Sequence, residues 1–276
     1  MRKMLIIFVI GILASAAYGE EASVLPEGDL RFSVNESAGY AEGEPLADFG
    51  LGVEYAPSDW LNLQLLWNPR FHPDPSIGNM YVSLKGFLLG EGALASAGSQ
   101  WLRLSAALGI LIPPPDKQPN LRDQTQDLWG SALRLYSDFL FGRYFYINLY
   151  AEGIFYPPQY VDNEVFYGDW VRHYIDLTGE LELRFEAPLK NGFVLKWGAP
   201  ARFFYAPYMN AADEYAGSQY LLSAGGYFGI KLPDGKPPFE LYLKYSGGIL
   251  GRYVNQAHRA SLIFKFTFAP GAKDSE

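Results

Sequence analysis

Residues 171–187, VRHYIDLTGELELRFEA, are the stretch of sequence that decides the fold. Every second position from Val171 is apolar, except for His173 and Gly179, and the positions between them are polar and mostly charged. A period of two residues is typical of a β-strand whose two faces meet different surroundings. The stretch is longer than the roughly 9–11 residues that a tilted strand needs to cross a bilayer, so we expect it to project beyond the bilayer.

The same alternation recurs in eleven other segments of the chain. An even number of strands is usual for single-chain bacterial barrels, and ten strands remain the alternative if the weak first pair or segment 80–88 is not a strand. The sequence therefore predicts an all-β fold, namely a closed, antiparallel, up-and-down transmembrane β-barrel. The expected strands are 28–35, 47–56, 60–68, 80–88, 101–112, 131–141, 144–156, 171–187, 192–206, 219–232, 238–246 and 259–268.

Charged residues distinguish the two faces of these expected strands. The apolar face carries no Asp, Glu, Lys or Arg, and an Arg or Lys facing the middle of a bilayer costs about 2–4 kcal/mol. We therefore assign the apolar face to lipid and the charged face to the interior. A soluble β-sandwich would also hide one face, but its other face would be open to water. The residues that we expect to line a pore are Arg103, Arg134, Glu152, Arg172, Asp176, Glu180, Glu182, Arg184, Lys196, Arg202 and Lys244.

The links between the expected strands alternate in length, as in outer-membrane barrels. Short turns with turn-forming residues occupy 57–59, 142–143, 188–191 and 233–237, and the long links are 36–46, 69–79, 113–130, 157–170, 207–218 and 247–258. Link 89–100 breaks the alternation, because it should be short and is long.

The first nineteen residues are typical of a secretory signal peptide. Arg2 and Lys3 form a basic start, residues 4–13 are an apolar run, and residues 17–19 (Ala-Tyr-Gly) are a plausible cleavage site. The apolar run is shorter than the roughly 20 residues of a spanning helix, which disfavours the alternative of an uncleaved membrane anchor. We expect a signal peptide over residues 1–19 and one barrel domain over residues 20–276.

Composition excludes some partners and linkages. The 276-residue chain has no Cys, so disulfides do not hold it together. Its net charge is −8, and because residues 1–19 carry two bases and no acid, residues 20–276 carry −10; an acidic chain argues against nucleic acid as a partner.

The six Trp residues lie at or near strand ends, and Trp67 and Trp197 fall on the outward face. They suit membrane-interface girdles better than the alternative, sugar-binding aromatics inside a channel.

The segment from Ala260 to Phe268, ASLIFKFTF, resembles the terminal strand of bacterial outer-membrane β-barrel proteins. At the level of pattern the resemblance covers the whole chain after the signal peptide, and it extends to spirochaete-type barrels and small porin-like channels. It implies a position in the cell outer membrane, contact with outer-membrane lipid, and recognition of Phe264, Phe266 and Phe268 by the barrel-assembly machinery. Residues 269–276 follow Phe268, which departs from the family pattern.

Residues for catalysis or metal binding do not come together in the sequence. A lipid hydrolase of the barrel wall needs a Ser and a His on one face, so on one strand their separation must be even. His258 and Ser261 are three residues apart, and the strand of His173 has no Ser on its outward face nearby. Acidic pairs such as Glu42 and Glu44 provide fewer ligands than calcium needs. We expect no catalytic site, no metal and no cofactor.

These features favour a channel that admits small hydrophilic solutes by passive diffusion through a polar lumen. Eight strands leave a lumen filled by side chains and sixteen leave an aqueous channel, so a twelve-stranded barrel can be open or plugged. The alternative is a non-enzymatic structural or adhesive barrel, closed by its own salt bridges, whose loops 113–130 and 157–170 bind a partner.

Overall fold

The computed structural model describes residues 21–41, 44–72, 76–90, 93–94, 101–113, 129–157, 159–160, 170–171, 175–208, 217–232, 239–252 and 257–268. The expected signal peptide lies outside the described residues. In the described part of the chain, no helix is long and apolar enough to cross a membrane. The strands are β1 (Leu30–Ala41), β2 (Glu44–Ser58), β3 (Leu61–His72), β4 (Ser76–Leu89), β5 (Leu102–Ile112), β6 (Gly130–Phe141), β7 (Phe145–Phe155), β8 (Gln159–Tyr160), β9 (Trp170–Val171), β10 (Ile175–Pro188), β11 (Val194–Tyr208), β12 (Gly217–Lys231), β13 (Phe239–Arg252) and β14 (Ala257–Phe268).

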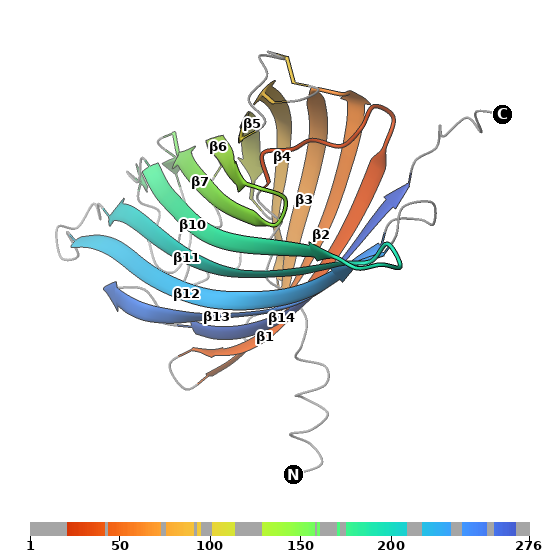
Figure 1. Ribbon diagram of the computed structural model, residues 1–276. Coiled ribbons are helices and arrows are strands. Elements are labelled where there is room, and N and C mark those ends of the chain that lie inside the picture. Colours follow the sequence, from red (N-terminus) through yellow and green to blue (C-terminus); the bar gives the residue numbers. More distant parts are fainter. Residues whose placement is uncertain are drawn as a thin grey trace, which may run out of the picture.

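Twelve of these strands close into one barrel (Figure 1). They pair antiparallel in the order β1-β2-β3-β4-β5-β6-β7-β10-β11-β12-β13-β14, and β14 returns to pair with β1. In Figure 1 the blue β14 accordingly lies beside the orange β1. Closure removes the free strand edges that lipid does not tolerate. The predicted closed antiparallel barrel of twelve strands is confirmed, and the ten-strand alternative is wrong.

Three of the predicted long links are short. β1 runs to Ala41 and β2 starts at Glu44, while β3 runs to His72 and β4 starts at Ser76. Likewise, β13 runs to Arg252 and β14 starts at Ala257. The prediction of long loops at 36–46, 69–79 and 247–258 is therefore wrong. The hydrogen bonds between neighbouring strands join main-chain groups. Strand pairing therefore continues past the last alternating apolar residue, through residues with small or polar side chains.

Tight turns join β2 to β3, β6 to β7 and β10 to β11 at one end of the barrel. We call this end the short-turn end. Gly142, between β6 and β7, has a φ of +70°, and Gly192, between β10 and β11, has a φ of +83°. Glycine adopts this left-handed backbone at no steric cost because it has no Cβ.

The stretch that begins at Val171 is not one continuous strand. The barrel strand β10 begins at Ile175, whereas β9 pairs with β8 in a separate two-stranded sheet. The predicted continuous strand 171–187 is wrong at its start, because side-chain alternation does not reveal which segment supplies the pairing partner. Arg172 and His173 lie outside the described residues.

The outer wall of the barrel is apolar. Leu108 on β5 is 66% exposed, Leu243 on β13 is 58% exposed, and Phe228 on β12 is 55% exposed. Each of the twelve barrel strands contributes at least one large exposed hydrophobic side chain. Soluble monomers rarely expose apolar surface on this scale, whereas a lipid-facing wall requires it.

One acidic residue lies on this apolar wall. Glu36 on β1 is opposite Phe49 on β2 and Leu262 on β14, so it shares their outward face. The prediction of an uncharged outward face holds for segment 28–35. It is wrong for β1 as a whole, because the strand extends to include Glu36. The alternation stops before Glu36, although the strand continues through it.

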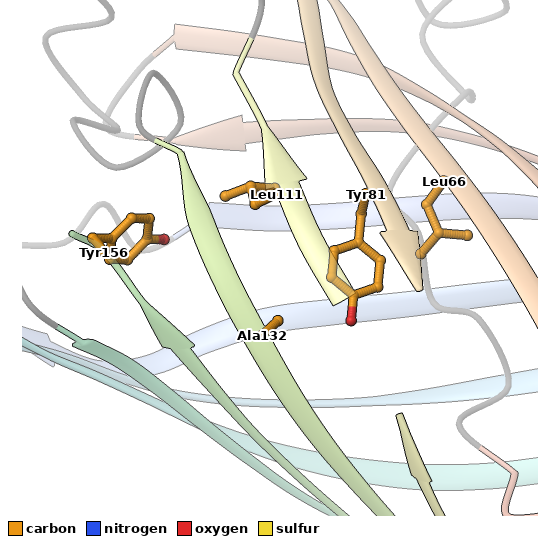
Figure 2. Close-up of a cluster of buried hydrophobic side chains, with 5 residues drawn as sticks. All are labelled: Leu66, Tyr81, Leu111, Ala132 and Tyr156. Atoms are coloured by element: carbon orange, nitrogen blue, oxygen red, sulfur yellow. The ribbon is translucent and has the colours of Figure 1, made fainter. Parts of the chain in front are cut away.

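Apolar side chains also occupy part of the inner wall. Leu66, Tyr81, Leu111, Ala132 and Tyr156 form a buried cluster. Figure 2 shows these side chains on β3, β4, β5, β6 and just after β7, directed into the space that the strands enclose. The inner wall therefore departs locally from the polar face that alternation predicts.

Candidate functional site in the barrel lumen

Residues 21–25, which we call the N-terminal segment, lie inside the barrel. Ala22 is fully buried and Leu25 is 2% exposed. Ala22 belongs to a buried cluster with Ala107 on β5, Tyr136 on β6 and Tyr150 on β7. Figure 1 shows the segment as part of the red stretch that leads into β1.

A turn at the short-turn end directs this segment into the lumen. The amide of Gly28 donates to the carbonyl of Ala56 at 2.7 Å, and the amide of Glu27 donates to the carboxylate of Asp59 at 2.9 Å. Gly28 has a φ of +85°, which favours glycine. Because Ala56 and Asp59 lie where β2 turns into β3, the segment enters the barrel from the short-turn end.

Three inward side chains bind the main chain of the N-terminal segment. The ammonium of Lys85 on β4 donates to two carbonyls of the segment, at 2.5 and 2.9 Å. Asp138 on β6 accepts a hydrogen bond from the Ala22 amide at 3.1 Å, and the hydroxyl of Ser105 on β5 donates to the Ala22 carbonyl. The segment is thus bound across three adjacent strands.

The side chain of Glu21 meets a cluster of cations. Its Oε1 lies 2.9 Å from Nη1 of Arg184 on β10 and 3.8 Å from Nζ of Lys196 on β11. Lys196 also lies 3.3 Å from Glu240 and 3.6 Å from Glu186. Burial acts to raise the pKa of Glu21, but the charges of Arg184 and Lys196 outweigh it and hold that pKa well below its usual value. Glu21 is therefore a carboxylate at neutral pH.

A second charged cluster surrounds Arg134 on β6. Its Nε donates to Glu152, the residue opposite it on β7, and its guanidinium carbon lies 3.7 Å from the ring centre of Tyr81 on β4. The side chains of Arg134 and Glu152 are 15% and 7% exposed. A planar guanidinium combines an ion pair with ring stacking in this way, which an ammonium does less well.

A third cluster surrounds Glu54 on β2. One of its oxygens accepts hydrogen bonds from Asn62 at 2.5 Å and Gln64 at 3.0 Å, both on β3. The other oxygen lies 3.4 Å from Nη1 of Arg31 on β1. Three polar partners compensate the loss of water around this carboxylate.

The acidic residues predicted on β10 lie along one stripe of the inner wall. Asp176 accepts a hydrogen bond from Tyr156 at 2.8 Å, and Glu182 accepts one from Tyr227 on β12 at 2.8 Å. Glu180, between them, lines a small space on the same face.

The other predicted pore residues lie at separate places. Arg202 on β11 lines a cavity in the lumen. Arg103 on β5 lies opposite Asp138 in the β5–β6 register, and Lys244 on β13 lies opposite Tyr227 in the β12–β13 register. Arg172 lies outside the described residues.

This cavity in the lumen has a volume of about 210 Å³. Glu21 and Ser23 line it, so the N-terminal segment forms part of its wall, and Arg134 and Leu111 line it further from the short-turn end. Sites for drug-sized ligands usually measure roughly 300–1,000 Å³. The cavity therefore suits ions and small polar solutes.

Sequence reasoning missed the N-terminal segment. Residues 21–25 stand between the expected cleavage site and the first expected strand, and they carry no periodicity or motif. Their partners lie far along the chain, since Lys85 and Arg184 are 64 and 163 residues from Glu21. Nothing in the sequence of such a short segment indicates that it lies inside the barrel.

His258 and Ser261 face opposite sides of β14, as their spacing predicts. His258 is exposed, and its Nδ1 lies 2.9 Å from the hydroxyl oxygen of Tyr245 on β13. Ser261 is 1% exposed, and the residue opposite it on β13 is Lys244, an inner-wall position. Within the described residues, no three His, Cys, Asp or Glu side chains gather as a potential metal site.

The three Phe residues of the expected assembly signal lie in the last half of β14. Phe266 and Phe268 are 41% and 49% exposed. Phe268 meets Phe32 on β1 edge to face, with ring centres 5.9 Å apart, and Phe264 and Phe266 both contact Phe239 on β13. Together they form an outward aromatic band at the short-turn end, where an interfacial girdle would lie.

Comparison with known proteins finds similarity only in solved structures. No protein-family model matches the sequence, and no curated protein matches it. A structure of the NanC porin has a TM-score of 0.49 and 9% identity, covering 86% of this chain and 99% of that one. The KdgM porin has a TM-score of 0.47 and 7% identity, with 86% and 99% coverage. The β domain of the Bordetella autotransporter BrkA has a TM-score of 0.46 and 15% identity, with 88% and 98% coverage.

Proposed function

We propose that the protein is an outer-membrane channel through which small hydrophilic solutes diffuse passively. The observation that carries the proposal is the contrast between the two walls of the barrel. The outer wall exposes at least one large hydrophobic side chain on every barrel strand, whereas the inner wall places ion pairs around a cavity of about 210 Å³. Lipid matches the first surface, and water with its solutes matches the second.

The charges that line the cavity favour anions over cations. Five bases and three acids line it, which leaves a surplus of two positive charges. Rings of fixed charge select ions of the opposite sign. The lining bases are Arg31, Lys85, Arg134, Arg202 and Lys265, and the lining acids are Glu21, Glu54 and Glu152.

The proposal includes the route by which the barrel reaches the membrane. Residues 1–19 act as the signal peptide, and the barrel-assembly machinery reads Phe264, Phe266 and Phe268 at the end of β14. Passive diffusion needs no catalytic group, metal or cofactor, so we propose a non-enzymatic protein.

Conductance of the purified protein in planar lipid bilayers tests the channel. We expect small, ohmic conductance steps and a reversal potential, under a salt gradient, of the sign for a modest anion preference. Arg202→Glu should lower that preference or reverse it, whereas the matched change Arg143→Glu, in the exposed turn between β6 and β7, should leave it unchanged. Absence of conductance, together with absence of solute uptake in liposomes, would contradict the channel.

The second candidate is a closed structural or adhesive barrel, and one observation favours it. The N-terminal segment occupies the lumen, and the charges beside it are paired. In this case deletion of residues 113–130 should abolish attachment of the protein to host or matrix surfaces. A channel without adhesive function would keep its conductance after the same deletion.

A further inference from the structure

Glu21 places a negative charge where bases predominate, in the part of the lumen near the short-turn end. Five bases and two acids of the strands interact electrostatically with Glu21. The bases are Arg31, Lys85, Arg184, Lys196 and Lys265, and the acids are Asp138 and Glu240.

The cations that hold Glu21 belong to the rigid wall, whereas Glu21 belongs to a segment bound only by non-covalent contacts. Arg184 and Lys196 project from paired strands, opposite Tyr146 and Gly229. Their side chains are 6% and 9% exposed, and Glu186 of the same wall lies 3.4 Å from Arg184 and 3.6 Å from Lys196. The wall therefore presents a preformed site for a carboxylate.

The place that Glu21 occupies can be reached from the cavity. The side chain of Glu21 is 26% exposed and lines the cavity together with Ser23. A solute that enters the cavity therefore meets the Glu21 carboxylate before it meets Arg184, which is more deeply buried.

We propose that Arg184 and Lys196 form a carboxylate-binding site in the lumen, that Glu21 occupies this site in the resting protein, and that a carboxylate-bearing solute competes with Glu21 and releases the N-terminal segment. The inference rests on the proposed function because the solute reaches the site through the channel. The segment then acts as a tethered plug whose release widens the short-turn end.

Disulfide trapping measures the position of the segment without requiring conductance. The chain has no Cys, and Ala22 packs with Ala107 in one cluster, so Ala22→Cys with Ala107→Cys provides a unique thiol pair. In protein extracted from outer membranes, we expect rapid intramolecular disulfide formation with a mild oxidant. Glu21→Gln should slow disulfide formation by about tenfold, the factor that corresponds to the loss of one charge-assisted hydrogen bond. Glu27→Gln, which removes an exposed charge just outside the lumen, should not slow it.

Competition identifies the ligand chemistry. Glutarate, which carries the same carboxylate as a glutamate side chain, should slow disulfide formation in the Cys pair, whereas sodium chloride at equal ionic strength and the neutral analogue glutaramide should not. Arg184→Gln should abolish the effect of glutarate. Equal effects of glutarate and chloride, or trapping that is insensitive to Glu21→Gln, would overturn the proposal.

Conductance then separates the plug from the channel. In one sodium chloride electrolyte at fixed ionic strength, added glutarate should raise the conductance of the reduced Cys pair, added glutaramide should not, and the oxidised Cys pair should not gain. If every variant fails to conduct, the channel is wrong, and the trapping experiments still decide the carboxylate site. If the protein conducts but locking the segment leaves conductance unchanged, the plug is wrong and the channel stands.

Discussion

The guanidinium of Arg134 contacts both the ring of Tyr81 and the carboxylate of Glu152, with its central carbon 3.7 Å from the ring centre. Removing one partner of a buried ion pair costs about 3–5 kcal/mol, because the other charge stays buried without compensation. We expect Arg134→Met to lower the free energy of unfolding by this amount, measured by urea titration in lipid vesicles. Arg134→Met with Glu152→Leu should recover most of the loss, and Arg143→Met, in the exposed turn, is the control.

Leu108 tests whether the outer wall faces lipid. It lies in the middle of β5 and is 66% exposed, so Leu108→Arg should lower the free energy of unfolding in lipid vesicles by about 2–4 kcal/mol. Leu94, in the link between β4 and β5, is 65% exposed, and Leu94→Arg is the matched control with little expected effect. Equal stability of the two variants would mean that the wall around Leu108 is in water.

The strands that cross the barrel could be predicted from sequence because their two faces differ. β5 and β7, at Leu102–Ile112 and Phe145–Phe155, lie within one residue of the expected segments at each end. Hydrophobic alternation marks residues that face lipid, and a charged residue on that face interrupts it. β1 continues through Glu36, where the alternation is broken, and Trp170–Val171 pairs with Gln159–Tyr160 in a separate sheet, which no periodicity records.

The contacts of the lumen could be predicted only where strand register defines them. The turn at Gly142 joins β6 to β7, so Arg134 and Glu152 must be opposite one another. Glu21 has no register, because the N-terminal segment is not part of a sheet. Its partners follow from the closure of the whole barrel, which no single stretch of sequence specifies.

Gly198 on β11 leaves room for the ring of Tyr227 on β12. A Cβ at this position would lie 2.5–2.7 Å from three atoms of the tyrosine side chain, whose hydroxyl donates to Glu182. Gly198→Ala should therefore displace Tyr227 and cost about 1–3 kcal/mol of unfolding free energy, as overpacking does. Gly179→Ala on β10, where the nearest atom would be 4.0 Å away, should be close to neutral in the same urea titration.

Glu36 reduces the stability of the barrel in lipid. It shares the outward face of β1 with its neighbours Phe49 and Leu262, and a carboxylate on a lipid-facing wall is unfavourable, though less so than Arg or Lys. Glu36→Leu should raise the free energy of unfolding in vesicles by about 1 kcal/mol. Glu27→Leu, in the exposed turn before β1, is the control, and a loss of stability in Glu36→Leu would show that Glu36 has a favourable partner.

The pH dependence of the N-terminal segment follows from the lowered pKa of Glu21. Arg184 and Lys196 outweigh burial and keep the carboxylate ionised well below its usual pKa of 4.5. The contribution of ionised Glu21 to holding the N-terminal segment in the lumen is therefore complete above pH 4.5. It is lost only as the pH falls through the lower pKa that Glu21 has in the folded protein. Hydrogen exchange of the peptide that contains Ala22, corrected for intrinsic rates, should show constant protection from pH 7 to pH 5 and a loss in stronger acid. Asp138, Glu186 and Glu240 also face this region, so Glu21→Gln is the control that isolates the effect: its protection should be lower throughout, with a smaller loss in acid. An equal loss in Glu21→Gln would assign the acid step to the strand carboxylates instead.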